Sequence, residues 1–209
     1  MTAISKADSA PSPWTEVQGI DALRVPGHTQ PDREPECLLY SMWMTLQYVN
    51  SVYPSEPVRE ATPVLRPEKL KQIITIREMG WSPDQDDLDA LSEETDPVGW
   101  EMKTWAGAPP MNTFYEVVKD GFDEELPTIA VVDAMRLQGR DQRGPLHAVV
   151  VTGLGDRKIV VNDPWGSMYD VYPRDRVADA WDTTLNRLIT VDLHEQSTLQ
   201  HTLTEDEPE

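Results

Sequence analysis

The spacing of hydrophobic residues changes part-way along the chain, and this change limits the possible folds more than any other feature. Before it, apolar residues recur every three or four positions, as on one face of a helix. After it come four short runs rich in β-branched residues and divided by Gly, Pro and charged residues, at 126–134, 146–154, 158–163 and 187–193. Such runs are typical of strands. The order predicts an α+β fold in which N-terminal helices pack on a C-terminal antiparallel sheet.

The clearest helical segment is 36–53. Pro35 and Glu36 stand at its start, as suits a first helical turn. Its apolar face consists of Leu39, Met42, Trp43, Leu46 and Val49. The segment 66–83 is expected to contain a helix that ends at Gly80, and the segment 82–97 an acidic helix with Ser82 as N-cap. The other expected elements are a helix over 111–122, an edge strand over 100–105 and a short helix over 173–181.

The chain of 209 residues is long enough for a single domain with a substantial core, since 39% of it is apolar and it contains 7 tryptophans. We expect this domain to span 23–196. The segments 1–22 and 197–209 are polar and lack a hydrophobic period, so we expect flexible tails there.

Acidic residues outnumber basic ones by 37 to 18, which gives a formal net charge of −19. This balance argues against nucleic-acid binding, because the phosphate backbone would be repelled. The acids are dispersed along the chain, which favours a halophilic protein from a salt-rich cytoplasm, where concentrated salt screens their mutual repulsion.

The expected compartment is the cytoplasm. With one cysteine the chain forms no internal disulfide. The first residues lack the basic and apolar regions of a signal peptide, and the apolar stretches are far shorter than the roughly 20 residues that span a bilayer. No membrane association is therefore expected, and the oligomeric state stays open.

The stretch GPLHAVVVTGLGDRKIVVNDPWGS, from Gly144 to Ser167, carries the chemistry. His147 opens one expected strand and Asp163 ends the next. In an antiparallel hairpin the start of one strand faces the end of the following strand, so the two side chains can be neighbours. The carboxylate would then orient the imidazole and stabilise its protonated form.

The only cysteine, Cys37, stands at the start of the first expected helix. Unpaired backbone N–H groups at such a position favour a thiolate, whereas the neighbouring acids Glu34 and Glu36 oppose it. An imidazolium partner would matter all the more. Catalysis by a thiol requires these three components: the nucleophile, a base, and a group that orients the base.

The segments TQPDREPECLLYSMWMTLQYV, LPTIAVVDA, LHAVVVTGLGDRKIVVNDPWG and VADAW resemble those of a known family. It is the family of peptidases that process bacteriocin leaders at a double glycine, with their stand-alone relatives, in the papain-like cysteine peptidase superfamily. The resemblance extends from Val25 to Val191. Its most specific part is the histidine strand followed by Asn-Asp-Pro.

The resemblance implies a cysteine-dependent hydrolase, most simply a peptidase, that acts on peptides or proteins without a cofactor. It assigns Cys37 as nucleophile, His147 as general base and acid, Asp163 as orienting carboxylate and Gln30 as oxyanion-hole donor. Leu38 departs from the family, which usually has Gly after the cysteine, and would crowd the cleft. Gln30 lies seven positions before Cys37 (37 − 30 = 7), farther than the family leads us to expect.

Each of these residues also has a structural explanation. Cys37 could be a small buried hydrophobe, His147 a core residue, Asp163 a turn residue and Gln30 a solvated loop residue. Asn162 competes with Asp163 for the orienting role. Adjacent strand residues face opposite sides, so only one of the two can point at His147.

Two other functions stay open: a non-catalytic peptide-binding module on the same fold, with its site closed by Leu38 and the acids, and acyl transfer by the same residues. Trp165 either walls the cleft or packs in the core, and Trp43 is expected in the core. His28 has no expected role. The spacing of His, Cys, Asp and Glu fits neither zinc nor calcium, so no metal is expected.

Overall fold

The computed structural model describes residues 12–31, 35–53, 65–74, 84–105, 111–182 and 186–193. Its helices are α1 (Cys37–Val52), α3 (Pro67–Ile73), α4 (Gln85–Thr95), α5 (Met111–Asp123), α6 (Ala134–Leu137) and α7 (Arg174–Asp182). Its strands are β1 (Trp14–Val17), β2 (Ile20–Leu23), β3 (Val98–Thr104), β4 (Thr128–Asp133), β5 (Leu146–Leu154), β6 (Lys158–Asp163), β7 (Ser167–Pro173) and β8 (Arg187–Leu193). Of these helices, none combines the length and the apolar character needed to cross a membrane.

The strands form one sheet, in which all pairs are antiparallel. Its main path runs β1-β2-β5-β4-β8-β3, and β6 pairs with β5 and β7 beside this path. The first two thirds of β5, from Leu146 to Val151, pair with β4, whereas β6 pairs with β5 only from Val150 onward. The start of β5 therefore extends past its β6 partner, which leaves room there for side chains of other elements.

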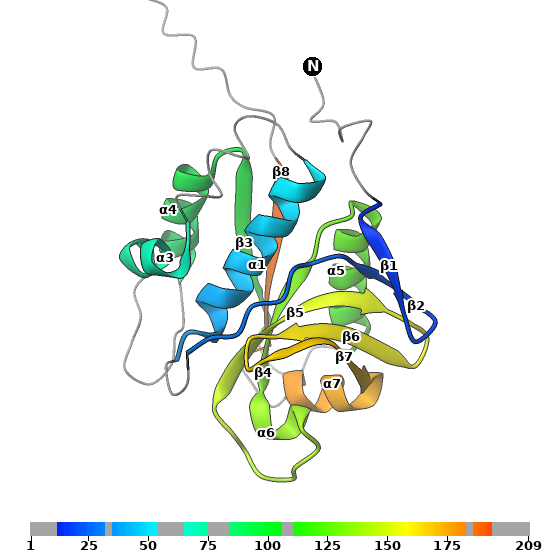
Figure 1. The fold of residues 1–209 in the computed structure, drawn as a ribbon. Coiled ribbons are helices and arrows are strands. Elements are labelled where there is room, and N and C mark those ends of the chain that lie inside the picture. The colour runs from blue at the N-terminus through cyan, green and yellow to red at the C-terminus, as the bar shows by residue number, and fades with distance from the viewer. Residues whose placement is uncertain are drawn as a thin grey trace, which may run out of the picture.

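Helices cover both faces of the sheet, as Figure 1 shows for α1 in front of the strands and α5 behind them. Along β5, Val150 packs in the core that contains α1, α3 and α4, and Val149 packs in the core that contains α5 and α7. Ile129 and Ala130 of β4 divide between the two cores in the same way. This alternation follows the period of two of a strand. It explains why every residue of β4 is buried.

The predicted α+β fold, with helices packed on an antiparallel sheet, is confirmed. The first predicted helix corresponds to α1, in which Leu39, Met42, Leu46 and Val49 are buried. The strand predictions for 146–154, 158–163 and 187–193 match β5, β6 and β8. The expected edge strand is β3, which pairs only with β8 among the described strands.

Two helix boundaries were predicted wrongly. Helix α3 ends at Ile73, before the predicted Gly80, because the β-branched run 73–76 disfavours a helix. The N-cap of α4 is Asp84, whose carboxylate accepts a hydrogen bond from the Asp87 backbone N–H in a reciprocal capping box. The expected cap Ser82, like Met79 and Gly80, lies outside the described residues.

The prediction of a flexible tail over 1–22 is wrong for its last part, where β1 and β2 form a hairpin on the sheet edge. Gln18 and Gly19 both have positive φ, 50° and 76°, as a two-residue hairpin turn requires. The turn pair Gln-Gly lacks the usual Asn or Asp, so sequence gives little sign of it. The expected C-terminal tail lies outside the described residues, and β1, β2 and β3 show that the sheet is not purely C-terminal.

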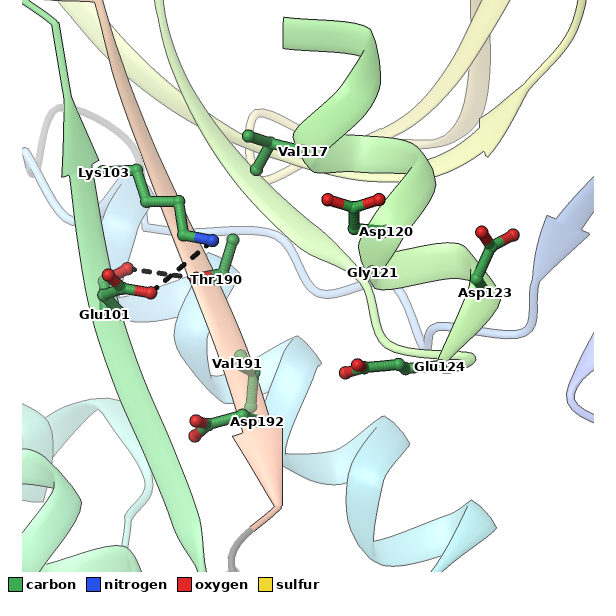
Figure 2. Close-up of a pocket in the computed structure, with 10 residues that line it drawn as sticks. All are labelled: Glu101, Lys103, Val117, Asp120, Gly121, Asp123, Glu124, Thr190, Val191 and Asp192. Atoms are coloured by element: carbon green, nitrogen blue, oxygen red, sulfur yellow. Dashed lines mark hydrogen bonds and ion pairs between the residues drawn. The ribbon is translucent and has the colours of Figure 1, made fainter. Parts of the chain in front are cut away.

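An acidic hollow of about 450 Å³ lies between α5 and the strands β3 and β8. Figure 2 shows Glu124, directly after α5, pointing toward Asp192 of β8, and Asp120 and Asp123 of α5 and Glu101 of β3 also line the hollow. Lys103 is the one basic residue in the lining, and its ammonium group lies 3.5 Å from the Glu101 carboxylate. The dispersed acids of the sequence therefore gather locally in the fold.

We expect the stability of the protein to rise with salt, because screening weakens the repulsion between these carboxylates. Asp120→Asn should raise the free energy of unfolding in dilute buffer and change it little in molar KCl. Urea unfolding at both salt levels measures this. Asp21→Asn, on β2, removes a carboxylate outside the hollow and serves as the control. A stability that does not change with salt would contradict the halophilic interpretation.

Candidate active site

Cys37 is the first residue of α1, and its side chain is partly exposed. Glu36 occupies the N-cap position, and its carbonyl oxygen accepts the backbone N–H of Tyr40 at 3.1 Å as the first hydrogen bond of the helix. The N–H groups of the first turn have no partner within the helix. They carry the positive end of the helix dipole, which favours an anion at Cys37.

A buried hydrogen bond holds the Cys37 end of α1 against the strand that carries His147. Ser41 lies one helical turn after Cys37, is fully buried, and donates its hydroxyl to the carbonyl oxygen of Ala148 at 3.2 Å. Ala148 directly follows His147. Ser41 was not predicted to have a role, although a small polar residue on the apolar face of a helix indicates a specific partner.

His147 lies at the start of β5, and its Nε2 is 2.7 Å from Oδ1 of Asp163 at the end of β6. The register explains this pairing. Val150 pairs with Asn162 and Val151 with Val161, so one further step would set Asp163 opposite residue 149, two positions from His147. Diagonal residues of this kind share a face of the sheet and are within reach of a long side chain.

The turn after β6 fixes the Asp163 carboxylate. Oδ1 of Asp163 also accepts a hydrogen bond from the backbone N–H of Trp165 at 2.8 Å. The backbone carbonyl oxygen of Asp163 accepts a hydrogen bond from the N–H of Gly166 at 3.0 Å. Gly166 has φ 120°, which favours glycine. The sequence Asp-Pro-Trp-Gly therefore builds a tight turn that aims the carboxylate at His147.

Asn162 faces away from His147. Its Nδ2 donates to the carbonyl oxygen of Val25 at 2.8 Å, and its Oδ1 accepts the N–H of Tyr169 at 2.9 Å. It is fully buried and ties β6 to the segment before α1 and to β7. The expectation that only one of the two adjacent residues can contact His147 therefore resolves in favour of Asp163.

The electrostatics of His147 favour its protonated form. The ring is 1% exposed, and this burial lowers its pKa. Hydrogen bonding and negative charge from Asp163 and Cys37 act in the opposite direction and raise the pKa to about 9, from an ordinary 6.5. Nδ1 is buried and has no hydrogen-bond partner of full geometry among the described residues. Cys37 is nevertheless close enough to the ring to raise its pKa.

Trp165 covers the His147 ring. The two rings are stacked, with centroids 4.0 Å apart and planes inclined by 28°. The indole remains 46% exposed, so it shields the imidazole on one side and faces solvent on the other. Trp165 therefore shields the His147 ring and is not a core residue.

The loop before His147 is organised by the buried carboxylate of Asp133. It caps α6 by accepting the N–H groups of Met135 and Arg136, at 2.9 and 3.0 Å. Both of its oxygens also accept the N–H of Gly144, at 2.9 and 3.0 Å. One side chain thus closes the loop between β4 and β5 and fixes where β5 begins.

Gln30 lies beside the turn that carries Asp163. Its backbone N–H donates to the carbonyl oxygen of Pro164 at 2.8 Å, and the residue is 8% exposed rather than solvated. The preceding segment packs closely on β7, since a Cβ at Gly27 would lie 2.0 Å from Cγ of Met168. The packed segment before Gln30 therefore holds it at the turn that carries Asp163, although Gln30 lies seven positions before Cys37 in the sequence.

Two residues that follow Cys37 in α1 pack in or against the hydrophobic core. Leu38 is 2% exposed and packs in the core with α1, so it does not fill a cleft as its size had suggested. Trp43 packs partly against the same core, as expected, and stacks on the ring of His28, with the two ring centroids 3.9 Å apart.

His28 anchors the segment that leads to Gln30. Its Nε2 lies 2.6 Å from Oε1 of Gln47. Glu34 lies outside the described residues.

Comparison with solved structures identifies the fold. A C39-like peptidase from Bacillus anthracis matches with a TM-score of 0.57 over 83% of this chain and 96% of its own, at 14% sequence identity. The peptidase domain of Streptococcus ComA, a bifunctional ABC transporter involved in quorum sensing, matches with a TM-score of 0.53 over 82% of this chain and all of that domain (100%), at 15% identity. The chain has the fold of the C39 peptidases.

A third solved structure is a double-glycine-motif protease from an AMS/PCAT transporter in complex with the leader peptide, with a TM-score of 0.49 at 15% identity over 82% of this chain and 93% of that one. No protein-family model and no curated protein matches the chain. The expected likeness to double-glycine peptidases is thus confirmed at the level of structure.

The raised pKa of His147 makes stability depend on pH. Because the folded pKa, about 9, exceeds the ordinary 6.5, the stabilisation is fully present below about pH 6.5 and is lost as the pH rises through 9. Asp163→Asn should therefore lower the free energy of unfolding by up to about 3 kcal/mol at low pH, since each pKa unit corresponds to about 1.4 kcal/mol. The difference in free energy of unfolding between the wild type and Asp163→Asn should shrink as the pH rises from about 6.5 to about 9.

Urea unfolding over this pH range measures the difference. Asp156→Asn, in the turn at the far end of the same β5–β6 hairpin, is the matched control and should show no such pH dependence. A wild-type advantage that stays constant with pH would contradict the assignment of the shift to Asp163.

Proposed function

We propose that the protein is a cysteine-dependent hydrolase that cleaves peptide bonds, with Cys37 as nucleophile, His147 as general acid and base, and Asp163 as the group that orients the imidazole. The observation that carries this proposal is the convergence of the three side chains from α1, β5 and β6, with His147 between the other two. Among the described residues, no group of three or more His, Cys, Asp and Glu side chains could hold a metal ion.

The proposed reaction begins with attack of the Cys37 thiolate on the substrate carbonyl carbon. The imidazolium of His147, held by Asp163 through Nε2, gives the proton on its other nitrogen to the departing amine. The C–N bond breaks and an acyl-enzyme forms on sulfur. His147, now neutral, accepts a proton from water as the water oxygen attacks the thioester carbon. The C–S bond breaks, the carboxylic acid leaves, and the Cys37 thiolate and the His147 imidazolium are restored.

The negative charge that develops on the carbonyl oxygen needs hydrogen-bond donors. The backbone N–H of Cys37, at the start of α1, is one candidate, and the side-chain amide of Gln30 is the second. One such donor contributes about 10²- to 10³-fold in rate. The bond from the Gln30 backbone to Pro164 supports this role, because it ties Gln30 to the turn that carries Asp163.

Exposed apolar side chains near the site support a peptide substrate. Trp165 stacks on the His147 ring and is 46% exposed, and Met168, at the start of the strand that follows this turn, is 53% exposed. Large hydrophobic side chains exposed around a cleft are typical of binding surfaces. A peptide with apolar side chains next to its scissile bond would cover them.

The proposal predicts a thiolate at Cys37 that persists below pH 7 and depends on His147. We expect iodoacetamide to alkylate the wild type at pH 6 at least about tenfold faster than His147→Ala, because the imidazolium stabilises the thiolate. Rates measured over pH 5–10 in high salt provide the test. His28→Ala removes the other described histidine and should leave the profile unchanged. Identical profiles for wild type and His147→Ala would contradict the proposed pair.

The proposal also predicts that Cys37→Ala abolishes turnover without harming the fold. Cleavage of a peptide library, followed by mass spectrometry, should fall by at least about 10³-fold. The free energy of unfolding should change by less than about 1 kcal/mol, because the lost side chain is small and partly exposed. Retained cleavage in the variant would contradict the mechanism. A reactive thiol without cleavage in the wild type would instead favour acyl transfer or peptide binding.

A further inference from the structure

A buried carboxylate belongs to the residue that directly precedes the proposed nucleophile in the chain. The side chain of Glu36 is 4% exposed, although the residue is the N-cap of α1 and precedes Cys37. It makes none of the usual capping contacts, because its side chain accepts no hydrogen bond from the N–H groups of the first turn. Burial of an ionised carboxylate is unfavourable unless the charge is paired.

The charge of Glu36 is paired with Lys71 of α3, whose ammonium group contacts the carboxylate. The lysine side chain is 39% exposed, so the ion pair is buried at its acidic end and open at its basic end. Helix α3 packs against α1 in part through the buried Leu70. The pair therefore links the start of α1 to a second helix, at the residue next to the thiol.

We propose that Lys71 is a positioning residue for the Cys37 thiolate: it neutralises Glu36 and so removes a buried negative charge that would oppose a thiolate at the next residue. This inference rests on the proposed function, in which the thiolate is the attacking species. Like charges at close range disfavour each other, most strongly away from water. Lys71 thus lets an acidic residue occupy the N-cap without loss of thiol reactivity.

The other ionisable groups around this turn come from the remaining elements packed on it. His147 of β5 favours the thiolate directly, and Asp163 of β6 acts through His147. Glu68 of α3 raises the pKa of Tyr40, one turn along α1, where burial is the larger cause. Lys71 is the cation that contacts the buried acid at the N-cap.

The test is a double-mutant cycle on the pH profile of Cys37 alkylation, measured on the full chain in high salt. In Lys71→Met the unpaired Glu36 should shift the midpoint of the profile upward by about one pH unit, which is about a tenfold loss of rate on its acidic side. Glu36→Gln combined with Lys71→Met should return the midpoint close to that of the wild type, because the opposing charge is then gone. Lys69→Met removes an exposed lysine from the same helix and should not shift the midpoint.

Two results would overturn the inference. One is a Lys71→Met profile that coincides with that of the wild type. The other is a double variant as shifted as Lys71→Met, which would show that the lysine acts through packing of α3 and not through charge. Glu36→Gln alone keeps the test decisive if Lys71→Met does not fold: its midpoint should fall, because Lys71 is then an unpaired cation, and an unchanged midpoint would overturn the inference.

These outcomes are separate from those of the proposed function. The absolute midpoint of the wild type tests the thiolate–imidazolium pair, whereas the shift between variants tests the coupling to Lys71. An ordinary thiol in the wild type would contradict the function, and a shift in Lys71→Met would still support the electrostatic coupling.

Discussion

The contact between the start of α1 and the start of β5 is the constraint on which the rest of the site depends. Ser41 donates to the carbonyl oxygen next to His147, and this buried hydrogen bond joins the helix that carries the thiol to the strand that carries the imidazole. The strand can accept the helix there because β6 pairs with β5 only from Val150 onward. A sheet fully paired along β5 would leave no such place. The short β6 and the Asp163 turn therefore create the opening and also supply the third side chain.

Buried polar groups around the site are held by specific partners, and these partners come from distant parts of the chain. Asn162 joins β6 to Val25 and to β7, Asp133 closes the loop before β5, and Lys71 balances Glu36. An unsatisfied group at any of these positions would cost a few kcal/mol. These polar contacts in the loops hold the site in place together with the two hydrophobic cores.

Sequence alone predicted the elements whose hydrophobic period is regular, and with them the hairpin that brings His147 and Asp163 together. It could not predict which face of α1 meets β5, since that depends on Ser41 finding a carbonyl more than a hundred positions away. It also missed β1 and β7, whose residues are at most half-buried, and β2, which is only 4 residues long, so that each gives a weak pattern. The effect of Leu38 was misjudged because its size was visible in the sequence and its direction, into the core, was not.

Aspartate, as the partner of His147, affects the charge of the imidazole in a way that an amide side chain would not. An asparagine can orient an imidazole, as in some thiol enzymes, but it adds no charge. The carboxylate of Asp163 helps raise the pKa of His147 to about 9, so the imidazolium persists at neutral pH although the ring is buried. In this chain the imidazolium stands near the start of a helix whose N-cap is itself an acid. Asp163 offsets the burial of His147, and Lys71 offsets the charge of Glu36. Without these two partners, the burial of His147 and the charge of Glu36 would suppress a thiolate at Cys37.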